Sequence, residues 1–467
     1  MSVDWSFVRL KDYCTKIGSG STPRGGANVY LDSGNVCLIR SQNIYNDGFS
    51  ENGLVFISDS DAEKLNNVEI ELNDVLINIT GDSVARVCLA PKDKLPARVN
   101  QHVAIIRTVK NELDPKFVRY FLTDRNTQNH LLTLAGTGAT RNALTKGMLE
   151  EFLVPKPDIL IQKKISKILS DLDEKIHLNN QINQTLESIA QTIFKSWYID
   201  FDPVRAKIAA KLEGADPEIA AMCVISGKSE AELKKMPEDD FAELQATAVL
   251  FPDELVESEL GEVPRGWEVT RFNKIILQYI DNRGKTPPTQ IDGIPLLEVK
   301  HLPEGSLNPD LNTEKRVSLE TFNNWFRAHL QEDDLIISTV GTIGRLCIIP
   351  ADKKLTIAQN ILGLRFEKDE VNPLFMYYQM DSCKFRNDVN ARLVITVQAS
   401  IKRKDLETID LLKPDINIQN VFAEKIKPFV LSQQSDESLK LIDIRDTLLP
   451  KLLSGEVSVE DIKQQQD

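Results

Sequence analysis

The sequence lacks the patterns that would place the chain in a membrane or outside the cell. Its apolar runs, such as residues 77–80 and 361–364, fall far short of the roughly 20 residues that a bilayer-spanning helix needs. Residues 1–5 contain no basic segment followed by an apolar one, so no secretion signal is predicted. We therefore expect a cytoplasmic protein, and 467 residues are enough for two to four domains.

Cysteine is scarce and scattered, which argues against a disulfide framework or a zinc site. The chain has no C-x-x-C pair and no short cysteine-histidine spacing. We interpret the six cysteines as reduced core thiols. They are Cys14, Cys37, Cys88, Cys223, Cys347 and Cys383.

The common catalytic motifs are missing too. No phosphate-binding G-x-x-x-x-G-K-[ST] loop occurs, and residues 81–86 lack both its second Gly and its Lys. The single Pro-Pro pair, Pro287–Pro288, is not part of the Asn/Asp-Pro-Pro-Tyr/Phe tetrad of a methyltransferase. No G-x-S-x-G or H-E-x-x-H motif is present, and the five histidines are isolated. We predict that the chain is not an enzyme, although nuclease carboxylate patterns are too degenerate to exclude.

The net charge of -13 is unevenly distributed. Lys+Arg and Asp+Glu balance at 18 each in residues 1–157 and at 20 each in 266–414, and the remaining segments carry the acidic excess. Residues 201–265 alone hold 7 basic and 15 acidic side chains. The two neutral blocks can present a basic face to phosphate, whereas the acidic segments are better suited to meeting a protein.

The sequence contains an internal repeat, with matching segments 257 to 264 residues apart. The first copy opens at Trp5 and the second at Trp267. The clearest match needs one single-residue gap and joins residues 73–91 to 333–350. The other matched segments are 5–10 with 267–272, 20–23 with 284–287, 38–44 with 296–302, 100–107 with 358–365, and 155–162 with 412–419.

Within each copy, short apolar runs bounded by Gly, Asn or Pro predict strands, as at residues 75–79, 103–106, 335–338 and 361–364. Segments 115–123 and 373–380 start with Pro and continue with helix formers, which predicts short helices. Each block is therefore expected to be an α+β domain with a curved sheet.

A heptad pattern follows the first block and predicts a long helix. The seam is interrupted only by polar residues, and an Asn at a core position would fix the register of a coiled coil. An amphipathic helix lying on a globular core would give a similar apolar stripe. The seam positions are Ile165, Ile168, Leu172, Lys175, Asn179, Ile182, Leu186, Ile189, Ile193 and Ser196.

The second copy decides in favour of two paired helices, because residues 421–453 repeat the pattern. Leu441, Ile444, Leu448 and Leu452 align with Leu186, Ile189, Ile193 and Trp197. A 35-residue helix is roughly 50 Å long, so an antiparallel pair of this length would keep the two blocks apart.

These observations predict five segments. Residues 1–157 and 266–414 form two similar α+β domains, separated by long coiled-coil helices in 158–200 and 415–467 that give the chain a pseudo-two-fold repeat. Residues 201–265 are an acidic connector with short helices. An ordered partner-binding surface is one reading of this connector, and its five prolines and acidic run favour a solvated linker.

This organisation resembles the specificity subunit of type I restriction-modification systems. Each copy opens with Trp-x-x-x-x-Leu/Phe, carries an Asp-Val/Leu-Leu/Ile-Ile strand that runs into Gly, and continues from Pro-x-Pro or Lys-Pro into a heptad helix. Residues 194–207 and 258–267 look like the central region of that family, and residues 454–457 look like its tail. The resemblance covers essentially the whole chain.

The resemblance implies a DNA-binding recognition subunit without catalytic activity. In this family each domain, called a target-recognition domain, grips one half of a split double-stranded DNA target, and the helices set the spacing and dock two modification subunits. Those subunits bring S-adenosylmethionine for adenine methylation, and restriction subunits add ATP- and Mg-dependent translocation and cleavage. No cofactor or metal is expected in this chain.

Base and phosphate contacts are expected from Arg, Lys, Asn, Gln, Ser, Thr and His in loops that follow strands. Structural ion pairs at Arg86 and Arg345, and ordinary turns at residues 20–23 and 284–287, are the alternatives. Because aligned positions such as 40–43 and 298–301 differ in chemistry, the half-sites should differ. The predicted DNA-binding residues are Thr22, Arg24, Arg40, Gln42, Asn43, Thr80, Ser83, Arg86, Gln101, Thr140 and Arg141 in the first copy, and Lys285, Thr286, Lys300, His301, Thr339, Thr342, Arg345, Gln359, Gln398 and Lys402 in the second.

Two rival hypotheses remain. A single-chain restriction-modification enzyme would need methyltransferase motifs, which these 467 residues do not contain. A coiled-coil scaffold whose two blocks bind proteins would show no sequence-dependent retention of DNA.

Overall fold

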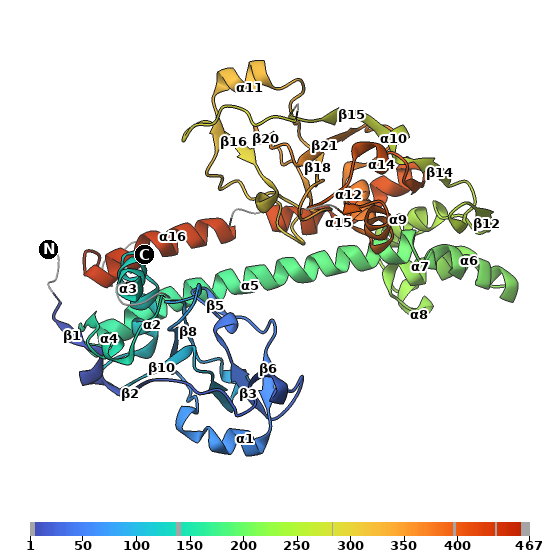
Figure 1. Cartoon of the computed structure of the whole chain (residues 1–467). Helices are drawn as coiled ribbons and strands as arrows, with labels where there is room; N and C mark the ends of the chain where they lie inside the picture. Colours follow the sequence, from blue (N-terminus) through green and yellow to red (C-terminus); the bar gives the residue numbers. More distant parts are fainter. Residues whose placement is uncertain (1–4, 137–141, 283, 396–397, 435–436, 459–467) are drawn as a thin grey trace. The chain divides into compact units, whose positions relative to one another are not determined.

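A computed structural model describes residues 5–136, 142–282, 284–395, 398–434 and 437–458. The chain divides into two compact units (Figure 1). Unit 1 comprises residues 1–180 and 436–467, and unit 2 comprises residues 181–435. The cut falls inside a long helix, so the units are not the five predicted segments, whose boundaries stay a prediction.

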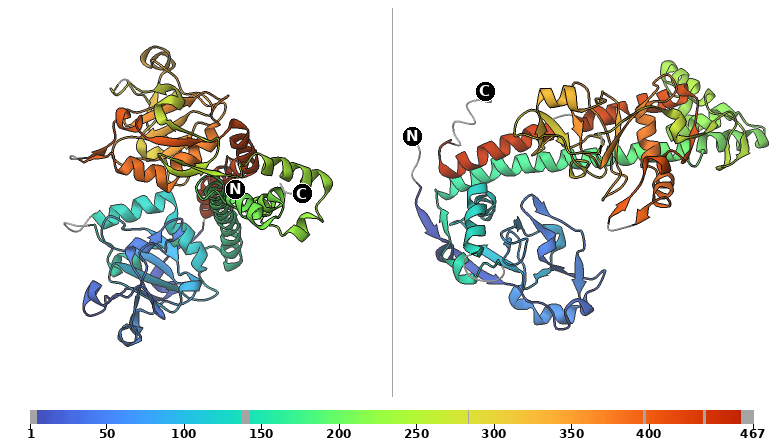
Figure 2. Two further views of the ribbon diagram at one scale, coloured as in Figure 1. Left: turned by 90° about the vertical axis from the view of Figure 1, so that its right-hand side faces the viewer. Right: turned by 45° about the horizontal axis from the view of Figure 1, so that its top comes forward.

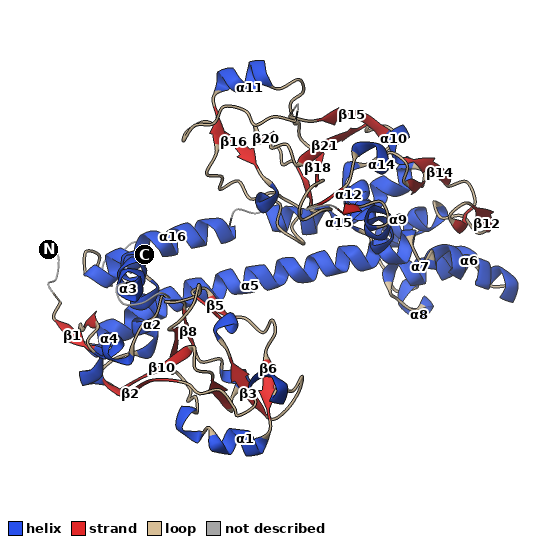
Figure 3. Ribbon diagram, viewed as in Figure 1, coloured by secondary structure: helices blue, strands red, loops and turns tan. Residues whose placement is uncertain are grey.

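The main sheet of unit 1 has four antiparallel strands in the order β2-β10-β7-β8. Figure 3 shows β2, β10 and β8 among the strands, drawn in red. Leu76 and Ile105 face one hydrophobic cluster, while Val75, Ile77 and Ile106 face another. The strands are apolar on both faces because both faces are covered, as a short, continuous apolar run predicts. Their bounds are β2 (Cys14–Ser19), β10 (Val103–Thr108), β7 (Val75–Asn78) and β8 (Val87–Leu89).

Smaller elements complete this domain. A three-stranded sheet has the order β6-β3-β9, and β1 pairs with β11 in an antiparallel ribbon. Ser58, Asp114 and Thr145 cap helices α1, α2 and α4 through their side-chain oxygens. The bounds are β6 (Val55–Ile57), β3 (Val36–Ile39), β9 (Ala97–Val99), β1 (Phe7–Arg9), β11 (Leu153–Pro155), β4 (Ile44–Tyr45), β5 (Gly48–Phe49), α1 (Asp59–Lys64), α2 (Pro115–Thr123), α3 (Arg125–Gly136) and α4 (Lys146–Glu150).

Unit 2 repeats this topology. Its four-stranded sheet has the order β15-β21-β18-β19, its three-stranded sheet the order β17-β16-β20, and β14 pairs with β24. The predicted strands and short helices are thus confirmed in both copies, as is the α+β class. The bounds are β15 (Ile276–Ile280), β21 (Ile361–Phe366), β18 (Leu335–Ser338), β19 (Leu346–Ile348), β17 (Arg316–Val317), β16 (Ile294–Leu297), β20 (Thr356–Ile357), β14 (Glu268–Arg271), β24 (Asp410–Lys413), β22 (Val394–Ile395), β23 (Ala399–Ser400), α10 (Phe272–Ile275), α11 (Leu319–Trp325), α12 (Pro373–Asp381), α13 (Cys383–Asn390) and α14 (Arg403–Leu406).

A pair between a buried Asp and an Arg recurs in both copies. The guanidinium of Arg107 donates to both carboxylate oxygens of buried Asp74 at 2.8 and 2.7 Å, and Arg365 does the same to Asp334 at 2.9 and 2.7 Å. Bidentate pairs of this kind hold the geometry as well as the charge. They join neighbouring parts of each sheet in the same way.

A fully buried glutamine begins each long helix. The Gln162 side chain accepts from the Asp114 backbone N–H at 2.8 Å and donates to the Pro157 carbonyl at 2.8 Å. Gln419 accepts from the Asn372 N–H at 2.9 Å and donates to the Pro414 carbonyl at 2.8 Å. These bonds satisfy loop backbone groups that burial would otherwise leave unpaired.

The predicted long helix is confirmed as α5 (Ile159–Tyr198), a single helix of 40 residues. The second one is described as α15 (Ile416–Gln434) and α16 (Glu437–Ser454), with residues 435–436 outside the described range. Figure 2 shows α16 running beside the first part of α5. Apolar side chains of both helices and of α2 form one cluster in unit 1. Its buried members are Phe117, Tyr120, Ile165, Leu169, Leu452 and Leu453.

The two helices run antiparallel. In unit 1, Asn179 donates to Glu437 at 3.0 Å, near the start of α16, while Asp173 lies 3.0 Å from Arg445, further along it. In unit 2, the Tyr198 hydroxyl donates to the Ile418 carbonyl at 2.9 Å. Asn179 therefore does contact the partner helix, whereas its effect on register stays a prediction. Two seam positions, Ile182 and Ile189, are 41% and 40% exposed.

Asp173 fastens the first domain to both helices of unit 1. Its carboxylate accepts from Arg119 Nη1 at 2.8 Å and from the Tyr120 hydroxyl at 2.7 Å, both on α2, and from Arg445 of α16. Burial alone would raise the pKa of Asp173, but these three donors outweigh it and hold the pKa below its usual value. In unit 2, Tyr378 of α12 donates to Glu187 of α5 at 3.0 Å.

The connector differs from the favoured prediction. Residues 201–265 do contain short helices, but a solvated linker is wrong, because Val204, Met222 and Leu233 are almost fully buried. Buried Lys207 donates to Glu218 at 3.0 Å and to the Phe251 carbonyl at 2.8 Å. Composition misled the prediction, since the acidic side chains cover a small apolar core. The elements are α6 (Asp202–Glu213), α7 (Pro217–Ser226), α8 (Glu230–Leu233), α9 (Glu238–Val249), β12 (Leu255–Ser258) and β13 (Gly261–Pro264).

Replacing either helix-start glutamine should destabilise its unit. Gln162→Leu or Gln419→Leu leaves buried backbone groups unpaired, so we expect each to lower the free energy of unfolding by about 1–3 kcal/mol. Urea denaturation followed by circular dichroism measures this. The control Gln181→Leu, at an exposed position of α5, should change stability little. Equal effects at all three positions would contradict the assignment.

Asp173→Asn should destabilise unit 1 by about 1.5–3 kcal/mol, because hydrogen bonds from charged donors to the carboxylate are lost. Asp171→Asn is the matched control, since Asp171 pairs only across the exposed helix surface with Lys167 at 2.9 Å and should cost less than about 0.5 kcal/mol. Thermal unfolding of the two variants side by side tests this, and similar melting temperatures would count against the role of Asp173.

Candidate nucleic-acid interface

Loops meet at the end of β7 in unit 1. Asn78, the fully buried last residue of the strand, donates through its amide to the Ser41 carbonyl at 2.8 Å and to Ser83 Oγ at 3.1 Å. One side chain therefore joins the loop that contains Arg40 and Gln42 to the turn that contains Ser83 and leads to Arg86.

Two further loops reach the same end of the sheet. The Thr80 hydroxyl lies 2.6 Å from His102 Nδ1, and Gln101 Nε2 lies 3.4 Å from His102 Nε2. The Ser21 N–H donates to the Val99 carbonyl at 3.0 Å, which brings Thr22 to this turn. A Cβ at Gly20 would lie 2.1 Å from that carbonyl oxygen, so only glycine fits this corner.

Arg40 and Gln42 share one acceptor. Arg40 Nη2 donates to the Gly53 carbonyl, and Gln42 Nε2 donates to the same oxygen at 3.2 Å. Asn43 is different, since it is fully buried and donates to the Ser50 and Asn52 carbonyls at 2.9 and 3.2 Å. The prediction that Asn43 contacts DNA is therefore corrected: its amide holds the loop.

Two tyrosines next to predicted arginines were missed from the sequence. The Arg86 guanidinium lies over the Tyr45 ring at 4.7 Å, and that of Arg40 lies over Tyr30 at 5.3 Å. Stacking on a ring keeps a guanidinium extended with its donors available. Neither tyrosine belongs to a motif, and Arg–aromatic proximity across loops is visible only in the fold.

Unit 2 builds the same corner with different side chains. Ser338, the buried last residue of β18, donates to the Thr342 carbonyl at 2.6 Å and accepts from the Arg345 N–H at 2.9 Å. The Thr339 N–H and hydroxyl both donate to the Asn360 carbonyl, at 2.8 and 3.2 Å. Thr342, Arg345 and the Gln359–Asn360 turn are thus brought together.

The position equivalent to Arg40 carries the opposite charge. Here Glu298 accepts from Lys315 at 2.6 Å, and Lys300 pairs with Glu314 at 2.6 Å. The hydrogen bond from Lys300 lowers the pKa of Glu314 to about 2. His301 is 3% exposed and accepts from the Glu298 N–H at 2.9 Å, so its prediction as a DNA contact is corrected like that of Asn43.

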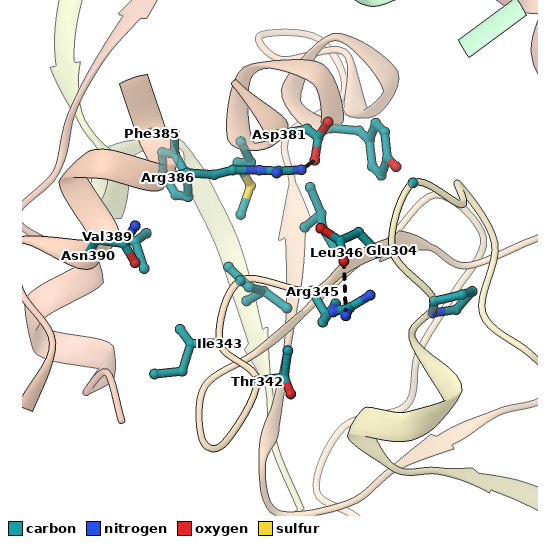
Figure 4. Close-up of a pocket in the computed structure, with 16 residues that line it drawn as sticks. Glu304, Thr342, Ile343, Arg345, Leu346, Asp381, Phe385, Arg386, Val389 and Asn390 are labelled. Carbon is teal, nitrogen blue, oxygen red and sulfur yellow. Dashed lines mark hydrogen bonds and ion pairs between the residues drawn. The ribbon is translucent and has the colours of Figure 1, made fainter. Parts of the chain in front are cut away.

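A pocket opens beside Arg345 (Figure 4). Arg345 forms an ion pair with Glu304 at 3.1 Å, and Asp381 accepts from Arg386 on the opposite side. Burial raises the pKa of Asp381 although Arg386 opposes this. The Glu304 pair agrees with the structural alternative for Arg345, but Glu304 is 70% exposed, and an exposed pair is easily exchanged for a phosphate or base.

The other predicted residues lie on or near the surface. Those that are exposed are Arg24, Gln42, Gln101, Lys285, Thr286, Lys300, Thr342, Gln359, Gln398 and Lys402. Those that are half-buried are Thr22, Arg40, Thr80, Ser83, Arg86, Thr339 and Arg345. Thr140 and Arg141 lie outside the described residues.

The described residues offer neither a cluster of metal ligands nor a membrane-spanning helix. Within them, no group of three or more His, Cys, Asp or Glu side chains is placed to hold a metal ion. No helix in the same part of the chain is long and apolar enough to cross a membrane.

Known proteins share the fold of this chain and part of its sequence. The fold is similar to the crystal structure of the type I restriction-modification S subunit from M. genitalium, with a TM-score of 0.53 and 14% identity over 96% of each chain. Residues 2–188 match the type I restriction modification DNA specificity domain.

Relatives extend the similarity to nearly the full length. The chain is 28% identical to the type I restriction enzyme HindI specificity subunit of Haemophilus influenzae, over 97% of this chain and 100% of the relative. It is 23% identical to the MjaIX specificity subunit of Methanocaldococcus jannaschii, over 98% of this chain and 95% of the relative. The chain is thus similar to type I restriction-modification specificity subunits over nearly its whole length, in agreement with the resemblance seen in the sequence.

Proposed function

We propose that this chain selects the DNA target of a type I restriction-modification complex, and that each domain reads one half of a bipartite site. The observation that carries the proposal is the duplicated corner, in which the same strand ends gather Arg, Gln and Thr side chains in each unit. Such side chains supply the bidentate base contacts and the phosphate contacts that DNA recognition needs.

The two corners differ at aligned positions, which supports different half-sites. Arg40 and Gln42 in the first copy correspond to Glu298 and Lys300 in the second. Arginine pairs with guanine and glutamine with adenine in the major groove, whereas a carboxylate accepts from cytosine. The target is therefore asymmetric.

The long helices serve as the spacer. A helix of 40 residues such as α5 is roughly 60 Å long, and two readers on a stiff connection recognise sites at a set separation. The unread bases between the half-sites follow from this spacing.

The chain contributes recognition and assembly, while partner subunits supply methyl transfer, translocation and cleavage. The long helices of unit 1 carry exposed apolar side chains: Leu178 is 49%, Leu439 is 67% and Ile444 is 45% exposed. Exposed apolar side chains on a helix pair are suited to a protein partner, and we assign them to the modification subunits.

Methylation in the presence and absence of the chain tests the proposal. Modification subunits mixed with the chain, S-adenosylmethionine and a random DNA library should methylate one split sequence with a fixed spacer, which sequencing of methylated sites reveals. Methylation that stays the same without the chain would contradict the proposal. A scaffold that binds only proteins would give no sequence preference.

Single arginine variants should act on one half-site each. Arg86→Ala should weaken recognition of one half and Arg345→Ala that of the other, each by about 1–3 kcal/mol, if the arginines contact bases. Competition binding against DNA in which one half-site is scrambled measures the change. Lys402→Ala is the comparison variant, since it removes an exposed charge elsewhere in the corner of unit 2. Equal losses on specific and random DNA would make the arginines phosphate contacts.

A further inference from the structure

Unit 1 carries an apolar groove between α2, α3, α4 and the β1–β11 ribbon. Phe121, Phe152 and His130 form its floor, with the Phe152 ring centroid 6.5 Å from that of Phe121 and 5.5 Å from that of His130. Phe7 and Leu153 flank the floor and are 60% and 52% exposed. Large apolar side chains with such exposure are unusual when they gather in one groove.

A groove in unit 2 overlaps the equivalent place, because the repeat aligns α2–α3 with α12–α13 and β11 with β24. Equivalent positions line both grooves. Phe121, Asn126, Thr127, His130 and Leu153 of unit 1 correspond to Gln379, Lys384, Phe385, Asp388 and Asp410 of unit 2.

In unit 2 this groove is covered by the chain itself. Leu260, Glu262 and Val263 from the β12–β13 hairpin line it from outside the domain, and Val263 is only 3% exposed. Arg205 of α6 lies 3.8 Å from Glu262 at its edge. In unit 1, by contrast, every described residue that lines the groove comes from the domain.

The open groove is also the more apolar of the two. The unit 1 groove has Phe121 and Leu153 where the covered one has Gln379 and Asp410, and only Thr127 against Phe385 goes the other way. A surface that stayed in water would gain nothing from this difference, whereas a surface that is buried on assembly would. The composition and the covered counterpart together indicate an occupant with aliphatic side chains, like those of the hairpin.

We propose that the unit 1 groove is a docking site for an aliphatic strand or hairpin of a modification subunit. The choice of partner rests on the proposed function, in which modification subunits are bound by this chain. The edge of the groove carries Arg9 and Glu151, paired at 3.2 Å and both more than half exposed, so a polar flank like that of Glu262 would find a partner there.

One consequence is that the two domains offer different surfaces to their partners. The groove of unit 2 is already lined on its outer side by the chain's own hairpin, so the contact that we propose is made only by the first domain. One of the two modification subunits should therefore be held more tightly than the other.

Leu153→Asp tests the docking site, because it introduces the residue type that unit 2 has at the equivalent position. We expect binding of one purified modification subunit to weaken tenfold or more, measured by analytical ultracentrifugation of the full-length chain with purified subunits. Leu72→Asp is the matched control, since Leu72 lies in the same unit, is 53% exposed and does not line the groove, and it should bind like the unaltered chain.

Photo-crosslinking provides a readout that does not depend on the stability of the variant. Benzoylphenylalanine at position 7 should crosslink to the modification subunit, and the same group at position 72 should not. Crosslinks only within the chain or to a second copy would overturn the proposal, as would full binding by Leu153→Asp. Failure of the unaltered chain to bind modification subunits would overturn the proposed function as well, whereas site-directed methylation by an unaffected Leu153→Asp complex would overturn the groove alone.

Discussion

Each unit depends on buried polar contacts that fasten a globular domain to a long helix. A glutamine at the start of a long helix satisfies backbone groups of the domain. A tyrosine of the domain also donates to a carboxylate of α5, from Tyr120 to Asp173 in unit 1 and from Tyr378 to Glu187 in unit 2. Apolar packing alone would permit the domain to slide or rotate on the helix surface. Hydrogen bonds with fixed partners do not, because a shift would leave buried groups unpaired. If base-reading loops are to meet DNA at a set position, this fastening is the step that fixes them to the helices.

The sequence could predict the parts of the fold that depend on periodicity and on the repeat. Heptad spacing identified α5, and short apolar runs identified β7, β10, β18 and β21, because both patterns follow from which faces are buried. The repeat then decided between a coiled-coil helix and an amphipathic helix on a globular core, which a single segment leaves open. The alignment of the two copies matched Gln162 with Gln419. Only the fold shows that each amide holds the equivalent loop of its own domain.

Other features follow from contacts between segments far apart, which periodicity does not encode. The helices of residues 201–254 enclose a small core around Met222, yet their composition is that of a solvated linker. Asn43 and His301 are residue types that read DNA, but each caps a short turn from inside. The stacked pairs Arg86–Tyr45 and Arg40–Tyr30 needed the loops to be placed before either tyrosine could be noticed.

Duplication within one chain makes it possible to separate what the fold requires from what a surface does. The Asp–Arg pairs, the helix-start glutamines and the strand orders are the same in both copies, since each satisfies groups that the shared backbone buries. Residues 40–43 and 298–301 occupy the same turn with different side chains, so the turn restricts the buried last position, Asn43 or His301, and leaves the more exposed positions free to differ. The grooves beside β11 and β24 also differ in side chains on a shared backbone. Two of its matched positions, Phe121 and Leu153, are apolar in the open groove and polar in the one that the hairpin lines. An apolar surface in water carries a cost in free energy that burial against a partner removes.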